Sequence, residues 1–313
     1  MTVTHQVLLY YLYTPIAKPE ELVERQRRLC TRLEMKGRIL IAAEGLNGTV
    51  EGTPEACAEY METLKQEPGF AGIKFKISPG TGQAFPKLQV RIREEIVTTK
   101  LPNPAAVGPL AARTGRYLSA EELHAWIHSD QEFYIVDMRN DYEYAVGHFA
   151  NSVLLEGFGN FRDLPRVLPQ IEHLKGKTVV TVCTGGVRCE KASGLLLEHG
   201  FEDVYQLQDG IVTYMEKYPN EDFLGKLYVF DGRMTVAFNE TSPEHQVVGK
   251  CALCGTKSEN LVDYYDRGPD GMALEGRKHN IVCGECIEAG RVVLDTEQAA
   301  LLNLAKYRHL QEK

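Results

Sequence analysis

The residues best suited to chemistry surround Cys183. This cysteine ends an apolar, β-branched run, VVTVC, and the following TGGVRCEKASGLLLEHG reads as a glycine-rich loop that leads into a helix. Inward-pointing N–H groups of such a loop, together with the positive end of the helix dipole, favour a thiolate over a thiol. They commonly lower the cysteine pKa from about 8.5 to roughly 3.5–7.5, and Arg188 adds a fixed positive charge. Cys183 is therefore predicted to be a nucleophile whose surroundings suit a persulfide equally well; the alternative is an inert buried cysteine.

A second group of cysteines lies near the end of the chain, in pairs. Cys251 and Cys254 form one C-x-x-C pair, and Cys283 and Cys286 form another. Two such pairs bring four thiolates into tetrahedral reach of zinc, and four sulfur ligands leave no open position, so the predicted zinc site is structural. Reduced or redox-active cysteines, or another metal, are the alternatives.

Basic residues are concentrated in the first hundred positions. Arg25, Arg28 and Arg32 recur at three and four residues, so they share one face of an expected helix. This face is either simply solvated or binds RNA phosphates. Five further residues alternate along two expected strands and widen that surface if they share its exposed side: Lys74, Lys76, Lys87, Arg91 and Arg93.

Composition limits the class of protein. The 313 residues are 43% hydrophobic and carry a formal charge of −8, which argues against a generically basic nucleic-acid binder. Residues 1–100 nevertheless hold 14 Lys and Arg against 12 Asp and Glu, so a polyanion is expected to bind there. No run approaches eighteen uninterrupted apolar residues, and residues 1–15 lack the pattern of an export signal. The expected location is the cytoplasm, without a membrane partner.

The first hundred residues alternate between strand and helix patterns. The expected order is βαββαβ, a ferredoxin-like sandwich over residues 1–100. Within it we expect a helix that starts at Pro19 and is closed by Gly37, a turn around Asn47 and Gly48, and a second helix capped by Thr53. The three prolines between residues 101 and 116 predict a linker.

From residue 117 to 220, short β-branched runs alternate with helical segments. This pattern predicts a parallel sheet covered on both faces, in which ligands bind at the carboxyl ends of strands. Cys183 occupies such an end. Residues 221–313 lose this rhythm and form a small cysteine-rich region, so the predicted class is an α/β multidomain protein.

The middle third resembles the rhodanese family in three ordered segments, DMRNDYEYAVGHFANSV, CTGGVR and LQDGIVTYME. Together with the ferredoxin-like front and the cysteine-paired tail, nearly the whole chain resembles the bacterial oxygen-dependent tRNA uridine(34) hydroxylases. The resemblance implies hydroxylation at carbon 5 of the wobble uridine, with molecular oxygen as co-substrate and the tRNA anticodon region as partner. It also implies that Cys183 is the essential cysteine and that Cys189 is a second, supporting cysteine. The implied cradle of Cys183 consists of Thr184, Gly185, Gly186, Val187 and Arg188. Asp137 and Arg139 are implied as possible supporting residues.

Two questions stay open from the residues alone. Hydroxylation with oxygen needs a source of electrons, but the sequence holds no flavin fingerprint and no convincing 2-His-1-carboxylate pattern, so the electron donor is unidentified. Asp137, Glu143 and His148 are interpreted as scaffold rather than reacting groups. The competing functions are a sulfurtransferase that carries persulfide on Cys183, and a zinc-stabilised adaptor without catalysis.

Overall fold

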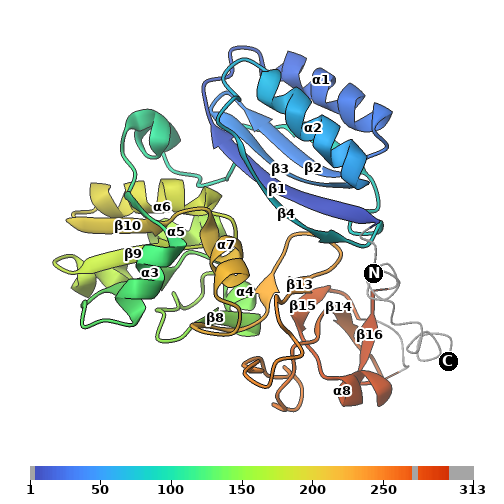
Figure 1. Ribbon diagram of the computed structural model, residues 1–313. Helices are drawn as coiled ribbons and strands as arrows, with labels where there is room; N and C mark the ends of the chain where they lie inside the picture. The colour runs from blue at the N-terminus through green and yellow to red at the C-terminus, as the bar shows by residue number, and fades with distance from the viewer. Residues whose placement is uncertain (1–3, 270–273, 296–313) are drawn as a thin grey trace. The chain divides into compact units, whose positions relative to one another are not determined.

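The chain divides into two compact units in the computed structural model, which describes residues 4–269 and 274–295 (Figure 1). One unit comprises residues 1–139 and 153–214, and the other comprises residues 140–152 and 215–313. Each unit is described by itself below. The predicted α/β multidomain class is confirmed, whereas the predicted boundaries at residues 100, 116 and 220 stay a prediction.

The first unit begins with a five-stranded sheet. Its strand order is β4-β1-β3-β2-β5, antiparallel except for the β2–β5 pair. The strands are β1 (His5–Tyr13), β2 (Lys36–Ala42), β3 (Gly45–Gly52), β4 (Lys74–Gly80) and β5 (Leu88–Ile92). The expected βαββαβ order is therefore present, followed by one more strand along the β2 edge.

Two helices cover one face of this sheet, α1 (Pro19–Arg32) and α2 (Pro54–Gln66) (Figure 1). Both start at a proline, which suits the first turn because its missing N–H has no helical partner there. The Thr53 hydroxyl caps α2 by accepting from the Ala56 N–H. Between helices and sheet, the buried Tyr60 hydroxyl lies 2.6 Å from that of Tyr10. Among the described residues of this domain, no helix covers the opposite face of the sheet (Figure 1).

Two local expectations in this domain are wrong. Helix α1 ends at Arg32, and Gly37 lies within β2, where a Cβ atom would approach the Thr49 carbonyl oxygen to 2.3 Å. The β2–β3 connection lies at residues 43–44, so Asn47 and Gly48 are inside β3. A Cβ at Gly48 would lie 2.4 Å from the Tyr10 ring, so packing rather than a turn requires this glycine.

A four-stranded parallel sheet follows in the same unit, with the order β6-β10-β9-β7. Its strands are β6 (Arg116–Leu118), β7 (Tyr134–Asp137), β9 (Thr178–Val182) and β10 (Asp203–Leu207). Four consecutive residues of β9 are buried, as expected for a strand covered on both faces. The helices around this sheet are α3 (Ala120–Ile127), α5 (Leu164–Val167), α6 (Val187–Glu198) and α7 (Gly210–Lys217). Four short 3-10 helices lie in the connections: η1 (Pro104–Ala106), η2 (Pro109–Ala111), η3 (Phe161–Asp163) and η4 (Leu168–Leu174).

The second unit contains short strands and the paired cysteines. Strand β8 (Gly147–Phe149) pairs with β11 (Phe223–Gly225), and β12 (Leu227–Tyr228) pairs with β13 (Thr235–Val236). A three-stranded sheet is formed by β14 (Leu261–Asp266), β15 (Lys278–Ile281) and β16 (Val292–Leu294), with β14 in the centre. The helices are α4 (Asp141–Val146) and α8 (Gly284–Glu288). Across residues 4–269 and 274–295, no helix combines the length and apolar character that crossing a membrane requires.

Candidate active site and metal centre

Cys183 lies directly after β9, at the carboxyl end of the parallel sheet. The loop that follows is short, because Gly186 already caps α6 with a φ of 98°, a left-handed conformation that glycine adopts readily. The strand, loop and helix predicted around Cys183 are therefore all present, and the first turn of α6 begins four residues after the cysteine.

The surroundings of the Cys183 sulfur favour its ionised form. Burial is complete and by itself raises the pKa. Opposing it are a hydrogen bond from the Cys189 thiol, the Arg188 guanidinium, and the backbone N–H groups of both residues, which together lower the pKa of Cys183 to about 6. These contacts therefore favour the thiolate form of Cys183 over the thiol.

Cys189 carries the proton of this pair. Burial, followed by its interactions with Cys183, raises the pKa of the Cys189 thiol well above the ordinary value. One cysteine is therefore held as a thiolate, and its neighbour is held as a neutral hydrogen-bond donor. The sequence identified Cys189 as a supporting residue, and this contact gives that role a physical basis.

Helix α7 holds the other side of the loop. The Ile211 N–H donates to the Cys183 carbonyl oxygen at 2.9 Å, and the Val212 N–H donates to that of Thr184 at 3.0 Å. Gly210 permits this approach, because a Cβ there would lie 2.6 Å from backbone atoms of Gly185. The later family-type segment LQDGIVTYME therefore anchors the cysteine loop.

The helix-free face of the N-terminal sheet contacts the same loop. A Cβ at Gly185 would lie 2.9 Å from the Leu9 side chain, and one at Gly186 would lie 2.8 Å from the Tyr11 hydroxyl. The Tyr13 hydroxyl donates to the Val187 carbonyl at 3.3 Å. The paired glycines thus serve this close packing as well as the turn, a requirement that the sequence did not reveal.

Sequence reasoning also missed Glu190, a buried carboxylate on α6. It accepts hydrogen bonds from the hydroxyls of Tyr11 at 3.2 Å and Tyr117 at 3.0 Å, and from the Gln206 amide at 3.1 Å. Burial is the largest influence and raises its pKa. Tyr11, Tyr117 and Glu190 line a cavity of about 160 Å³. No local spacing signals this cluster, because its members come from distant segments.

Asp137 and Arg139 form a closed ion pair near the loop rather than an open reactive site. Both side chains are fully buried, and Arg139 Nη2 lies 2.6 Å from Asp137 Oδ2. Asp137 also accepts the Arg139 N–H at 3.0 Å, while the Met138 N–H bonds to the Val182 carbonyl beside Cys183. These contacts support a scaffold role.

Glu143 and His148, both in the second unit, also bond to nearby backbone. Glu143 accepts from the Asn140 N–H at 3.0 Å and completes a capping box at the start of α4. His148 Nδ1 donates to the Tyr144 carbonyl at 2.9 Å, and its ring stacks on that of Tyr144. Both bonds fit the interpretation of these residues as scaffold.

The four paired cysteines come together in the second unit. The sulfur atoms of Cys251, Cys254, Cys283 and Cys286 all lie within 4.8 Å of one another, and Cys254 Sγ lies 3.5 Å from Cys283 Sγ. Tetrahedral zinc with bonds of about 2.3 Å sets its sulfur ligands roughly 3.8 Å apart. The cluster can therefore bind a metal ion such as zinc.

The basic residues expected to contact RNA differ in how free their charges are. Arg25 donates twice to the Glu67 carboxylate, at 2.8 and 3.0 Å, and Arg32 pairs with Glu59 at 2.7 Å. Arg28 is exposed and forms no ion pair within the part of the chain that the structure describes. Two of the three charges are thus partly neutralised.

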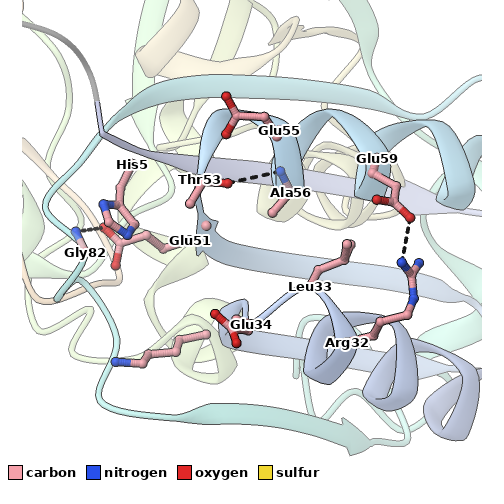
Figure 2. Close-up of a pocket in the computed structure, with 12 residues that line it drawn as sticks. His5, Arg32, Leu33, Glu34, Glu51, Thr53, Glu55, Ala56, Glu59 and Gly82 are labelled. Carbon is pink, nitrogen blue, oxygen red and sulfur yellow. Dashed lines mark hydrogen bonds and ion pairs between the residues drawn. The ribbon is translucent and has the colours of Figure 1, made fainter.

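A cavity of about 380 Å³ adjoins Arg32 in the N-terminal domain (Figure 2). Four glutamates and three basic residues line it, and Glu51 already accepts hydrogen bonds from the backbone of residues 81, 82 and 84. Figure 2 shows the Arg32–Glu59 ion pair at one side of this cavity. The excess of carboxylates makes it a poor site for a phosphate.

Comparison with known proteins assigns the chain to a family. Three family models match in succession: a UPF0176 acylphosphatase like domain over residues 5–96, a Rhodanese-like domain over residues 119–217, and a Rhodanase C-terminal domain over residues 224–296. A tRNA uridine(34) hydroxylase of Cytophaga hutchinsonii is 47% identical over 83% of this chain and 80% of its own. The corresponding protein of Bacillus cytotoxicus is 45% identical over 83% of this chain and 79% of its own.

The chain belongs to the tRNA uridine(34) hydroxylase family. The resemblance drawn from the sequence is thereby confirmed. Among solved structures, a rhodanese-like domain protein from Staphylococcus aureus is 26% identical and covers 32% of this chain and 90% of its own, with a TM-score of 0.28. A thiosulfate sulfurtransferase from Pseudomonas aeruginosa is 23% identical, covers 34% of this chain and 20% of its own, and has a TM-score of 0.30.

Proposed function

We propose that this hydroxylase-family member acts on tRNA and hydroxylates carbon 5 of uridine 34, with molecular oxygen as co-substrate and Cys183 as the reactive residue. The name of its relatives supports the reaction. The observation that carries the assignment of Cys183 is its lowered pKa at the carboxyl end of the parallel sheet. The cytoplasm, where tRNA is processed, is the proposed location.

In this proposal, different residues of the active-site loop have different roles. Thr184, Gly185, Gly186 and Val187 would form the cradle expected from the family resemblance. The backbone N–H groups and side chains of Arg188 and Cys189 favour the ionised Cys183 sulfur. One oxygen atom of O₂ enters the C5–H bond and the other leaves as water, so the reaction consumes two electrons and two protons from a reductant. Asp137 and Arg139 hold the strand ends that position the loop.

The tRNA contacts are proposed for the N-terminal domain. Of the helix residues Arg25, Arg28 and Arg32, Arg28 has the charge best placed to bind a phosphate. Arg38 and Arg91 are also exposed and lack an ion pair among the described residues. They lie on the helix-free face, whose other strands contact the active-site loop. In this proposal, one RNA strand on this face would contact both the basic residues and the loop that carries Cys183.

Zinc is the metal proposed for the four-cysteine cluster. Cys251, Cys254, Cys283 and Cys286 would hold it, and the ion would supply cross-links between segments that have little core of their own. The small core around these cysteines has few other buried members: Val262, Tyr264, Val282, Ile287, Val292 and Leu294.

Nucleoside analysis of tRNA tests the proposed reaction. In a strain that lacks this gene, 5-hydroxyuridine derivatives at position 34 should disappear; the wild-type gene should restore them, and Cys183→Ala should not. Cys57→Ala is the matched control, because Cys57 is equally buried but has a raised pKa of about 11. Nucleoside profiles that are unchanged by the deletion would remove the proposal.

A second candidate function is sulfur transfer, which the same observation favours. An anion cradle that stabilises a thiolate also stabilises the anionic terminal sulfur of a persulfide. The Cys183 thiolate would attack the outer sulfur of thiosulfate, the sulfur–sulfur bond would break, and sulfite would leave. The treated protein would then gain the mass of one sulfur atom on Cys183. Absence of that adduct, together with no thiocyanate formed from cyanide, would reject this candidate. A non-catalytic adaptor is disfavoured because the cysteine and its loop are intact.

A further inference from the structure

Lys76 is the one cation of the N-terminal sheet that reaches the active-site loop among the described contacts. It lies on β4, in register with Leu9 of β1, whose side chain packs on Gly185. Only 10% of the Lys76 side chain is exposed. A lysine is rarely buried unless its charge is paired, so this position calls for an explanation.

Three groups surround the Lys76 ammonium. It donates to the Gly185 carbonyl oxygen at 3.1 Å and lies 3.3 Å from Asp209 Oδ1. Its third neighbour is the ring of Tyr11, 4.9 Å from the nitrogen to the ring centre. The Gly185 carbonyl belongs to the second residue after Cys183, so this contact ties β4 to the active-site loop.

Lys74 provides an internal comparison. It lies two residues earlier on the same strand and pairs with the other oxygen of Asp209 at 3.0 Å. Its side chain is 60% exposed, and among the described residues its ammonium bonds to Asp209 rather than to the loop. Both lysines therefore neutralise Asp209, but only Lys76 bonds to the segment that carries Cys183.

We propose that Lys76 is a positioning residue for the active-site loop: it holds the loop through the carbonyl of Gly185, two residues after Cys183, and its charge favours the Cys183 thiolate. The inference rests on the proposed role of Cys183. It makes the N-terminal domain part of the catalytic centre, in addition to any role in binding tRNA. In addition to the direct contact with the loop, the negative charge of Cys183 acts to raise the pKa of Lys76.

Groups from several elements act on the charge of Cys183 or on Lys76. Helix α6 contributes Arg188 and Cys189, and strand β1 contributes Tyr11 and Tyr13. Strand β4 contributes Lys74 and Lys76, and Asp209 lies directly before α7. Burial lowers the pKa of Lys76, whereas Asp209 and Cys183 oppose that change. Asp209 is thus the counterion that opposes the effect of burial on Lys76.

The test measures the ionisation of Cys183 directly. The full-length protein is alkylated with iodoacetamide at a series of pH values, and the Cys183 peptide is quantified by mass spectrometry. The midpoint is the pH at which the alkylation rate of Cys183 reaches half of its plateau value. Lys76→Met should raise this midpoint by about one pH unit, because the variant removes a cation that favours the thiolate. Lys76→Gln, which keeps a hydrogen-bond donor but not the charge, should shift it in the same direction.

Two control variants separate the charge from a general disturbance. Lys76→Arg retains a cation and should keep the wild-type midpoint, and Lys74→Met should leave it unchanged although it also removes a partner of Asp209. The plateau rate at high pH reports access to the sulfur separately from its pKa. Unchanged midpoints in folded Lys76→Met and Lys76→Gln would overturn the inference.

The outcome is independent of whether the proposed reaction is correct. Alkylation requires neither tRNA nor oxygen, so a failure of hydroxylation in the wild-type protein would leave these midpoints interpretable. Conversely, the wild-type protein could hydroxylate tRNA while Lys76→Met and Lys76→Gln keep the wild-type midpoint. That result would reject the positioning role of Lys76 and leave the proposed function intact.

Discussion

At the scale of single residues, Cys183 and Cys189 show how surroundings separate two identical side chains. Both are fully buried and belong to the same apolar cluster. The helix N–H groups and Arg188 converge on the Cys183 sulfur and lower its pKa, whereas the Cys189 pKa is raised by burial and by the neighbouring thiolate. The proton therefore has a defined place in the pair.

The pair predicts a specific pH dependence. Because Cys183 has a pKa of about 6, its alkylation rate should rise as pH increases through 6 and level off near neutrality. Cys189→Ala removes the thiol donor and should move that midpoint upward, while Cys189→Ser keeps a donor and should move it less. Peptide-level mass spectrometry measures all three profiles. A wild-type midpoint near the ordinary cysteine value of about 8.5 would contradict the assignment of Cys183 as a thiolate.

At the scale of elements, the two faces of the N-terminal sheet have different tasks. Helices α1 and α2 bury one face in an apolar core. On the other face, one row of paired residues runs from Lys76 through Leu9 and Thr49 to Arg38. Four neighbouring strands span roughly 14 Å, about two nucleotide steps of an extended RNA strand. The active-site loop contacts one end of this row, and an exposed arginine lies at the other.

This arrangement predicts which arginines bind tRNA. A double variant, Arg38→Ala with Arg91→Ala, should weaken binding and reduce the slope of log affinity against log salt by about 1 for each phosphate that is no longer bound. The double variant Arg25→Ala with Arg32→Ala should change binding less, because both residues already bind glutamates. Filter binding at several salt concentrations compares them. The reverse ranking would place the RNA on the α1 surface instead.

At the scale of the whole molecule, the two units depend on different kinds of stabilisation. The first unit contains two large apolar clusters, one for each sheet. The second unit has smaller clusters, and three of the four paired cysteines are buried members of the one around β14. Cross-links through a metal would therefore matter most for the second unit.

Metal analysis tests this dependence. The purified protein should contain about one zinc ion per chain, and Cys286→Ser should abolish it and lower the melting temperature, because loss of a structural ion removes several kcal/mol of folding free energy. Cys183→Ser, which alters a cysteine outside the cluster, should retain zinc. Full stability of the Cys286→Ser variant, or a wild-type protein that contains no zinc after expression in zinc-replete medium, would argue against a structural zinc site.

The sequence by itself determined the features that depend on local order. Alternating patterns predicted the ferredoxin-like and parallel-sheet domains, because strand and helix periodicities are properties of adjacent residues. The strand, loop and helix around Cys183 and the spacing of the four cysteines could be read in the same way. The capping of α2 by Thr53 followed from residues within one turn.

Only the tertiary structure decided the features that depend on distant partners. Gly37 and Gly48 were expected to end a helix and form a turn, but both are required by side chains or backbone from neighbouring strands. Lys76 was expected to widen the RNA surface if it lay on the exposed side of the sheet. It is instead buried, because Gly185 and Asp209, more than a hundred residues away, provide its partners. Local sequence carries no record of such contacts, since they arise when separate elements pack together.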